Sequence, residues 1–185
     1  MIFKKFLLFN LFLLKIAILF CQENHKSHSI NDSIKINSFK HGEWFEYRIH
    51  YGFINAGFAT LEIIEDSINN KAVFHSKGYG KTVGLARLFF KVEDFYESYF
   101  DKFTGLPYKF IRNIYEGGYT KNTEIFFNHK LGLANVDDKK NDKKYSLPLN
   151  QNAQDMISAF YYLRNFFNPS EIKVDDTLDI NMFFD

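Results

Sequence analysis

Residues 43–51 read Glu43-Trp44-Phe45-Glu46-Tyr47-Arg48-Ile49-His50-Tyr51. Every second side chain from Phe45 onward is aromatic or aliphatic, and in an extended backbone such side chains share one face. Alternation with a period of two is typical of a β-strand that has one face in a protein core. The stretch therefore predicts a strand that buries Phe45, Tyr47, Ile49 and Tyr51 and exposes its opposite face.

Similar stretches recur along the chain at short intervals. Turn-forming sequences separate them, among them Asp66-Ser67-Ile68-Asn69-Asn70 and the glycine pair Gly117-Gly118. A short helical turn is expected within residues 81–90, and residues 137–144, which contain no apolar side chain, are expected to form an exposed loop. Since tight turns join antiparallel neighbours, the fold class is mainly β, an antiparallel meander. The further strands are expected at residues 58–65, 71–79, 92–101, 108–115, 119–128, 131–136 and 177–184.

One longer helix is predicted, over residues 153–165. Asn152 is its expected N-cap, and Asp155 stands three residues later, as in a capping box. Apolar side chains recur at helical spacing and define one stripe, which consists of Met156, Phe160, Leu163 and Phe167. We interpret this segment as an amphipathic helix packed on the sheet. The alternative is a surface that faces a ligand, for which Met156, Phe160 and Leu163 are the candidate residues.

The first 21 residues have the layout of a secretory signal peptide, with a basic head and an apolar run that ends at Cys21. A permanent membrane anchor needs roughly 18 or more apolar residues in a row, and Lys15 interrupts this run. We therefore expect residues 1–21 to be removed by cleavage at Cys21, so that the remaining chain does not span a membrane. A lipid anchor on Cys21 is the weaker alternative, because the bulky Phe20 precedes it.

This leader predicts export to the periplasm of a Gram-negative bacterium, or association with its outer membrane. Residues 22–41 are rich in Asn, Ser, His and Lys, which predicts a flexible arm. Residues 42–185 are then expected to form a single β-rich domain of ordinary size. The chain stops directly after Met182-Phe183-Phe184-Asp185, so we expect this domain to be incomplete at its C-terminus.

The composition excludes one class of partner. Of the 23 basic residues, three belong to the predicted signal, which leaves 20 against 22 acidic residues. A balance this close to neutral does not favour nucleic acid as a partner. The chain contains 23 Phe and 11 Tyr, while Cys21 is its only cysteine. The domain is therefore expected to hold together by packing instead of disulfides.

No catalytic, metal-binding or cofactor-binding set of residues is predicted. Gly80-Lys81-Thr82 matches the end of a phosphate-binding loop, but His75 stands where that loop needs its first glycine. The six histidines lack the close pairing with Cys or His that zinc sites use. Glu93, Asp94 and Glu97 are carboxylates of the kind used in acid–base chemistry, yet alternation along a solvated strand explains them equally well.

Seven short segments of the chain share a pattern with one known family. They include Gly42-Glu43-Trp44 in residues 42–52 and Glu116-Gly117-Gly118-Tyr119, and the others are residues 55–57, 84–94, 104–107, 154–164 and 181–185. In combination they resemble the exported bacterial family termed domain of unknown function 3108, from about Gly42 to the end of the chain. The resemblance implies several more strands beyond Met182-Phe183-Phe184, and it brings no catalytic residues. The meander is also similar to the half-barrels of envelope lipid and lipoprotein carriers, which implies a curved sheet or half-barrel.

Three functions remain open. The leading hypothesis is a non-enzymatic envelope protein that binds or carries a hydrophobic ligand, a lipid or a lipoprotein, in an apolar cavity between the sheet and the helix at residues 153–165. The alternative is a structural or interaction protein, with another envelope protein as its partner, whose aromatic side chains fill a core. An enzyme that acts on cell-wall or lipid substrates is the third.

Overall fold

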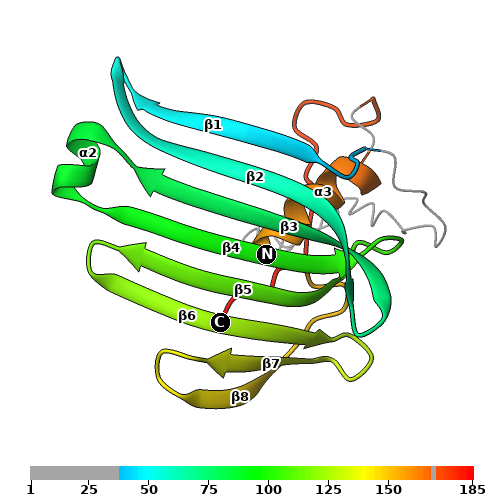
Figure 1. The fold of residues 1–185 in the computed structure, drawn as a ribbon. Coiled ribbons are helices and arrows are strands. Elements are labelled where there is room, and N and C mark those ends of the chain that lie inside the picture. The colour runs from blue at the N-terminus through cyan, green and yellow to red at the C-terminus, as the bar shows by residue number, and fades with distance from the viewer. Residues whose placement is uncertain (1–37, 168–169) are drawn as a thin grey trace, which may run out of the picture. The chain divides into compact units, whose positions relative to one another are not determined.

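The computed structural model describes residues 38–167 and 170–185, all of which belong to one compact unit of residues 32–185. Eight strands form a single antiparallel sheet in the order of the sequence, with β1 and β8 as its two edges (Figure 1). This confirms the predicted antiparallel meander, and the sheet is not closed. The strands are β1 (Glu43–Tyr51), β2 (Ile54–Ile68), β3 (Lys71–Thr82), β4 (Val92–Asp101), β5 (Pro107–Glu116), β6 (Tyr119–Asn128), β7 (Leu133–Asp138) and β8 (Lys143–Pro148).

Two helices accompany the sheet in the described part of the chain. The short helix α2 (Gly84–Phe89) connects β3 to β4, where a helical turn was predicted. The longer helix α3 (Met156–Phe166) packs across one face of the sheet (Figure 1). We call this face the inner face and the opposite one the outer face. Beneath α3, its side chains Ile157 and Tyr161 join a buried core with Ile63, Phe100 and Ile125 of the sheet.

Two predicted elements were wrong. Residues 137–144 form the ends of β7 and β8 and the turn between them, because Asp137 pairs with Lys144 and Asp138 with Lys143 across the ladder. Opposite charges stabilise such a pair at a sheet edge without any apolar alternation. The predicted strand at 177–184 is also absent: its β-pairing is one isolated bridge, between Met182 and Gln154. The segment instead packs against the inner face through its side chains. The Phe183 ring meets the Phe127 ring edge-on, with the centroids 5.7 Å apart.

The cap of α3 differs from the prediction and shifts the buried stripe of the helix. Asp155, not Asn152, is the N-cap, and its Oδ1 atom accepts the backbone N–H groups of Ile157 and Ser158 at 2.8 Å each. Its Oδ2 atom accepts the Ser98 hydroxyl at 2.6 Å, which ties the start of α3 to β4. The helix therefore buries Ile157, Ser158, Ala159, Tyr161 and Tyr162, while Met156 of the predicted stripe is 43% exposed.

The first strand is extended as predicted, but only its beginning is covered. Phe45 is half-buried and meets the Phe160 ring of α3 edge-on, with the centroids 6.2 Å apart. Tyr47 is 43% exposed, Ile49 is 53% exposed and Tyr51 is 84% exposed, so their predicted burial was wrong. Alternation assigns Tyr47 and Ile49 to the inner face correctly, but β1 is an edge strand and α3 does not cover them.

The predicted flexible arm at residues 22–41 reaches into the described part of the chain. Phe39 is buried there, and its ring contacts Tyr161 and Phe74 with centroids 4.7 and 5.2 Å apart. The packed domain therefore includes residues from at least Phe39 onward. The predicted signal peptide at 1–21, its cleavage site Cys21 and the rest of the arm lie outside the described residues.

We expect Ile63→Ala to lower the free energy of unfolding by about 2–5 kcal/mol, because Ile63 is fully buried beneath α3. The matched variant Ile49→Ala removes the same atoms from the inner face of the neighbouring strand. Since Ile49 is half-exposed, its loss should cost about 1 kcal/mol or less. Urea unfolding of the two variants measures the difference. Equal losses would show that the uncovered end of the inner face is packed in solution.

A second prediction concerns pH. Complete burial raises the pKa of Asp155 from 3.8 to about 6. Because the folded pKa lies above the unfolded one, the stability gained by protonating Asp155 is present below about pH 4 and lost as the pH rises through 6. Asp155→Asn keeps a carbonyl for the cap and an amide that donates to Ser98, and it removes the buried charge.

We therefore expect Asp155→Asn to match or exceed the natural protein in stability at pH 7.5, by up to about 3 kcal/mol. The difference between the two proteins should shrink to near zero at pH 4. Urea midpoints measured at several pH values provide both curves, and subtraction cancels the other carboxylates. A variant that is less stable at pH 7.5, by an amount independent of pH, would contradict this account of the cap.

Candidate functional site

The part of the inner face that α3 leaves uncovered is the candidate functional site. We call it the open inner surface and define it by Tyr47, Ile49, Ala59 and Gly80. Tyr47 pairs with Ala59 and Ala59 with Gly80 in the register of the sheet, so the three form one row across β1, β2 and β3. Tyr47 and Ile49 are exposed, and the other two are partly exposed.

Small residues at the centre of this surface leave free space above the backbone of the sheet. A Cβ atom added to Gly80 would have no heavy atom within 4 Å. Closer to the helix, a Cβ atom on Gly78 would lie 3.4 Å from the Cδ1 atom of Ile157, so α3 covers the sheet directly at that position. The boundary between covered and open surface thus lies between Gly78 and Gly80, two residues apart on β3.

An aromatic row leads from the helix onto the open inner surface. The Phe160 ring contacts Phe45, and the Phe45 ring stacks on Tyr47 with centroids 6.0 Å apart. Of the three candidate ligand-facing residues, the structure therefore places Phe160 at the border of this surface. Met156 is exposed and Leu163 is partly exposed, and neither belongs to the buried side of α3.

Side chains fill the space directly beneath α3. The Tyr161 ring lies 5.5 Å from Phe100 and 4.7 Å from Phe39, and Phe39 lies 5.2 Å from Phe74. A filled aromatic core therefore stands where the sequence predicted an enclosed apolar cavity. Any apolar ligand would have to bind outside this core.

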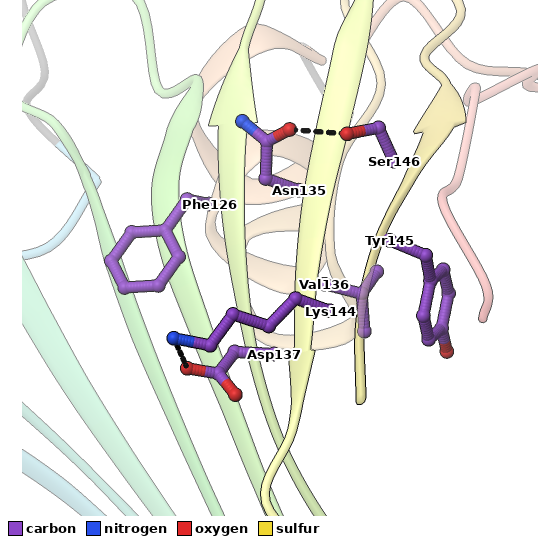
Figure 2. Close-up of a pocket in the computed structure, with 7 residues that line it drawn as sticks. All are labelled: Phe126, Asn135, Val136, Asp137, Lys144, Tyr145 and Ser146. Atoms are coloured by element: carbon purple, nitrogen blue, oxygen red, sulfur yellow. Dashed lines mark hydrogen bonds and ion pairs between the residues drawn. The ribbon is translucent and has the colours of Figure 1, made fainter. Parts of the chain in front are cut away.

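The outer face carries two open hollows. One, of about 370 Å³, lies over β6, β7 and β8, and Figure 2 shows the side chains that line it. Its polar groups are paired: the Asp137 carboxylate lies 3.4 Å from the Lys144 ammonium and 2.6 Å from that of Lys139 in the adjacent turn, and the Ser146 hydroxyl donates to Asn135 at 2.7 Å. The Lys139 hydrogen bond lowers the pKa of Asp137, so this carboxylate is held in its charged form.

The second hollow, of about 350 Å³, lies on the outer face near β1, β2 and β3. Its lining combines two aromatic rings with Thr60, Val83 and the charged residues Glu46 and Lys81. The Arg48 guanidinium lies over the Phe58 ring and the Lys81 ammonium over the Tyr79 ring, at 5.4 and 5.6 Å from the centroids. Neither hollow contains a nucleophile beside a base, which is the arrangement that covalent catalysis requires.

A cluster of titratable groups surrounds His75 on the outer face. Its Nδ1 atom lies 3.2 Å from Asp66 and its Nε2 atom 2.7 Å from Glu97, while the Tyr99 ring stacks on the imidazole at 3.9 Å. Only a doubly protonated imidazole donates to both carboxylates at once. Because the ring is buried and both nitrogens are occupied, this cluster joins β2, β3 and β4 and leaves no free nitrogen for a substrate.

The structure separates the three carboxylates that the sequence grouped together. Glu93 pairs with Arg87 and Lys91 at 3.2 and 2.8 Å, and Glu97 pairs with His75. Asp94 lies on the opposite face, where burial raises its pKa and the Tyr115 N–H donates to it at 3.1 Å. The three therefore do not form a common acid–base pair.

Within residues 38–167 and 170–185, no three or more His, Cys, Asp or Glu side chains are placed to hold a metal ion together. In the same residues, no helix combines the length and apolar character needed to cross a bilayer.

The open inner surface could not be found from the sequence alone. Periodicity assigns Tyr47 and Ile49 to the same face as Phe45, but it does not say where the covering helix ends. The signal that was available is the pair of small residues Ala59 and Gly80, which leave room above the strands.

The chain was compared with known proteins by family, by sequence and by structure. Neither the curated proteins nor the solved structures give a match. One family model matches residues 46–185, about three quarters of the chain, and it covers every strand from within β1 onward. The chain therefore belongs to the family described as "Protein of unknown function (DUF3108)".

Proposed function

We propose that this protein is a non-enzymatic component of the bacterial envelope that holds the acyl chain of a lipid or lipoprotein against the open inner surface. The observation that carries the proposal is the exposure of Tyr47 and Ile49 beside the unoccupied space above Gly80. Adjoining apolar side chains that stay exposed on a folded domain mark binding sites more often than scattered single ones do.

The shape of this surface suits an extended apolar chain. Ala59 and Gly80 let such a chain approach the backbone, while Tyr47 and Ile49 rise beside it on β1 and Phe160 closes the end at α3. Each methylene removed from water contributes about 0.8 kcal/mol, so about six methylenes supply roughly 5 kcal/mol. A binding free energy of this size corresponds to a Kd on the order of 0.2 mM. Such weak binding suits the reversible transfer of a lipid.

The expected compartment supports the same function. The apolar run before Cys21 favours export, and an acyl chain that leaves a membrane there must be shielded from water. We accordingly propose a location in the periplasm or at the outer membrane of a Gram-negative bacterium. The partner is then a lipid, or an envelope protein that carries one.

The filled core beneath α3 favours a second candidate function, that of a structural or interaction protein of the envelope. In that case another envelope protein covers Tyr47 and Ile49, and no lipid binds. An enzyme on cell-wall or lipid substrates ranks third, because the polar groups of the hollow in Figure 2 pair with one another instead of converging on a substrate.

Two leucine substitutions on β2 test the proposal. Ala59→Leu places a branched side chain on the open inner surface, whereas Thr60→Leu places the same side chain on the outer face. We expect Ala59→Leu to weaken saturable binding of the apolar dye 1-N-phenylnaphthylamine to the full chain by roughly tenfold. Palmitate should displace the dye, and Thr60→Leu should bind within about twofold of the natural protein.

Urea midpoints of both variants show whether the fold is intact. Equal dye binding by the two folded variants would exclude the open inner surface as the site. A natural protein that folds but binds neither dye nor palmitate would leave the structural or interaction function as the better account.

A further inference from the structure

One end of the sheet carries a cluster of exposed apolar side chains. The β1–β2 turn and the helix α2 lie together at this end (Figure 1). The side chains here that are between 57% and 97% exposed are Tyr51 at the end of β1, Phe53 in the turn, and Leu85, Leu88 and Phe89 of α2. We call these five residues the apolar tip. Single exposed apolar residues are normal, whereas five on two adjoining loops form a patch that calls for a partner.

The loops of the apolar tip are held in place by backbone contacts. The Val83 N–H, at the start of α2, donates to the Ala56 carbonyl of β2 at 3.0 Å. On the other side of α2, the Gly117 N–H donates to the Lys91 carbonyl at 2.8 Å. The Phe90 ring covers Gly117 so closely that a Cβ atom there would overlap it. The tip is thus a fixed feature of the fold with its apolar side chains pointing into solvent.

The two chain segments that form the tip carry only positive charges. Residues 51–54 and 83–91 contain no Asp or Glu, and they contain the two cations Arg87 and Lys91. Both cations pair with Glu93, which lies farther along β4 and offsets one of their two charges. Lys81 and Arg48 add further positive charge on the flanking strands, over the Tyr79 and Phe58 rings. An apolar patch with a cationic border matches the boundary between anionic headgroups and acyl chains.

We propose that the apolar tip inserts into the headgroup–acyl boundary of an anionic lipid bilayer. Aromatic side chains favour that depth, and nearby Lys and Arg side chains are attracted to acidic headgroups. The tip consists of a turn and a short helix at strand ends, which enter a lipid surface without exposing a long unpaired strand edge to it. This inference concerns a surface other than the open inner surface, and it holds whether or not that surface binds an acyl chain.

Tryptophan quenching in the full chain tests the insertion. Trp44 is the only native tryptophan, so Trp44→Phe provides a background in which a single Trp replaces Phe53, Phe89 or Phe103. Phe103 is the matched control, because it is 75% exposed but lies in the β4–β5 turn at the opposite end of the sheet. Vesicles of phosphatidylcholine and phosphatidylglycerol carry bromine on their acyl chains as the quencher.

We expect Trp at positions 53 and 89 to shift to shorter emission wavelength and to be quenched by bromine, while Trp at position 103 is unaffected. Comparison of positions within one chain separates tip insertion from binding by the apolar N-terminal run, which all variants share. Binding should be at least about fivefold weaker to vesicles of phosphatidylcholine alone.

Equal quenching at all three positions, or quenching at none, would overturn the proposal. A blue shift at positions 53 and 89 that depends on protein concentration and needs no lipid would also overturn it, because the tip would then bind a second copy of the chain. Loss of palmitate binding with intact quenching would affect only the proposed carrier function.

Discussion

The hydrogen bond from the Ser98 hydroxyl to Asp155 is the contact on which the arrangement of the inner face depends. The two residues are 57 positions apart, and their oxygen atoms lie 2.6 Å apart in the core. The same carboxylate caps α3, so one side chain sets both where the helix starts and which strand lies beneath that start. At its other end the helix is held to β1 by Arg164, whose guanidinium donates to Glu43 at 3.0 Å. Burying the carboxylate is unfavourable at neutral pH, as its raised pKa indicates, and the donors around it offset that cost.

Because both ends of α3 are fixed, the surface that it leaves open is fixed as well. Ile157 lies against Gly78, while Gly80 has no covering atom. The side chains of Phe45, Tyr47 and Ile49 on β1 then form an apolar row, which starts beside Phe160 and runs toward Tyr51 of the apolar tip at the end of the strand. If the tip contacts a bilayer, this row connects the lipid surface with the helix. The two proposals rest on separate observations, yet together they describe a route along which an acyl chain leaves a membrane.

The sequence predicts the strands well because period-two alternation and turn residues are local properties. It fails where the outcome depends on distant contacts. The N-cap of α3 was placed three residues too early: Asp155 caps the helix through the local N–H groups of Ile157 and Ser158, and its further bond to Ser98 is a distant contact that no local pattern reports. The strand β8 was missed because it begins with Lys143 and Lys144, which pair with Asp138 and Asp137 of β7. Such a run of charged residues is typical of a solvated loop. Alternation assigned Ile49 to the correct face, but burial on that face depends on the reach of α3. The position of the open inner surface also depends on where α3 ends on the sheet, so local sequence patterns could not predict it.

The most direct measurement of the central claim is residue-level mapping of a photoactivatable fatty acid bound to the full chain. The label carries a diazirine in its acyl chain, and tandem mass spectrometry locates the modified residues after irradiation. The account predicts modification of Tyr47 and Ile49 on β1, with competition by unlabelled palmitate. It predicts no modification of Trp44 or Arg48, which lie on the outer face of the same strand. Modification confined to the outer face, or modification that palmitate does not reduce, would contradict it.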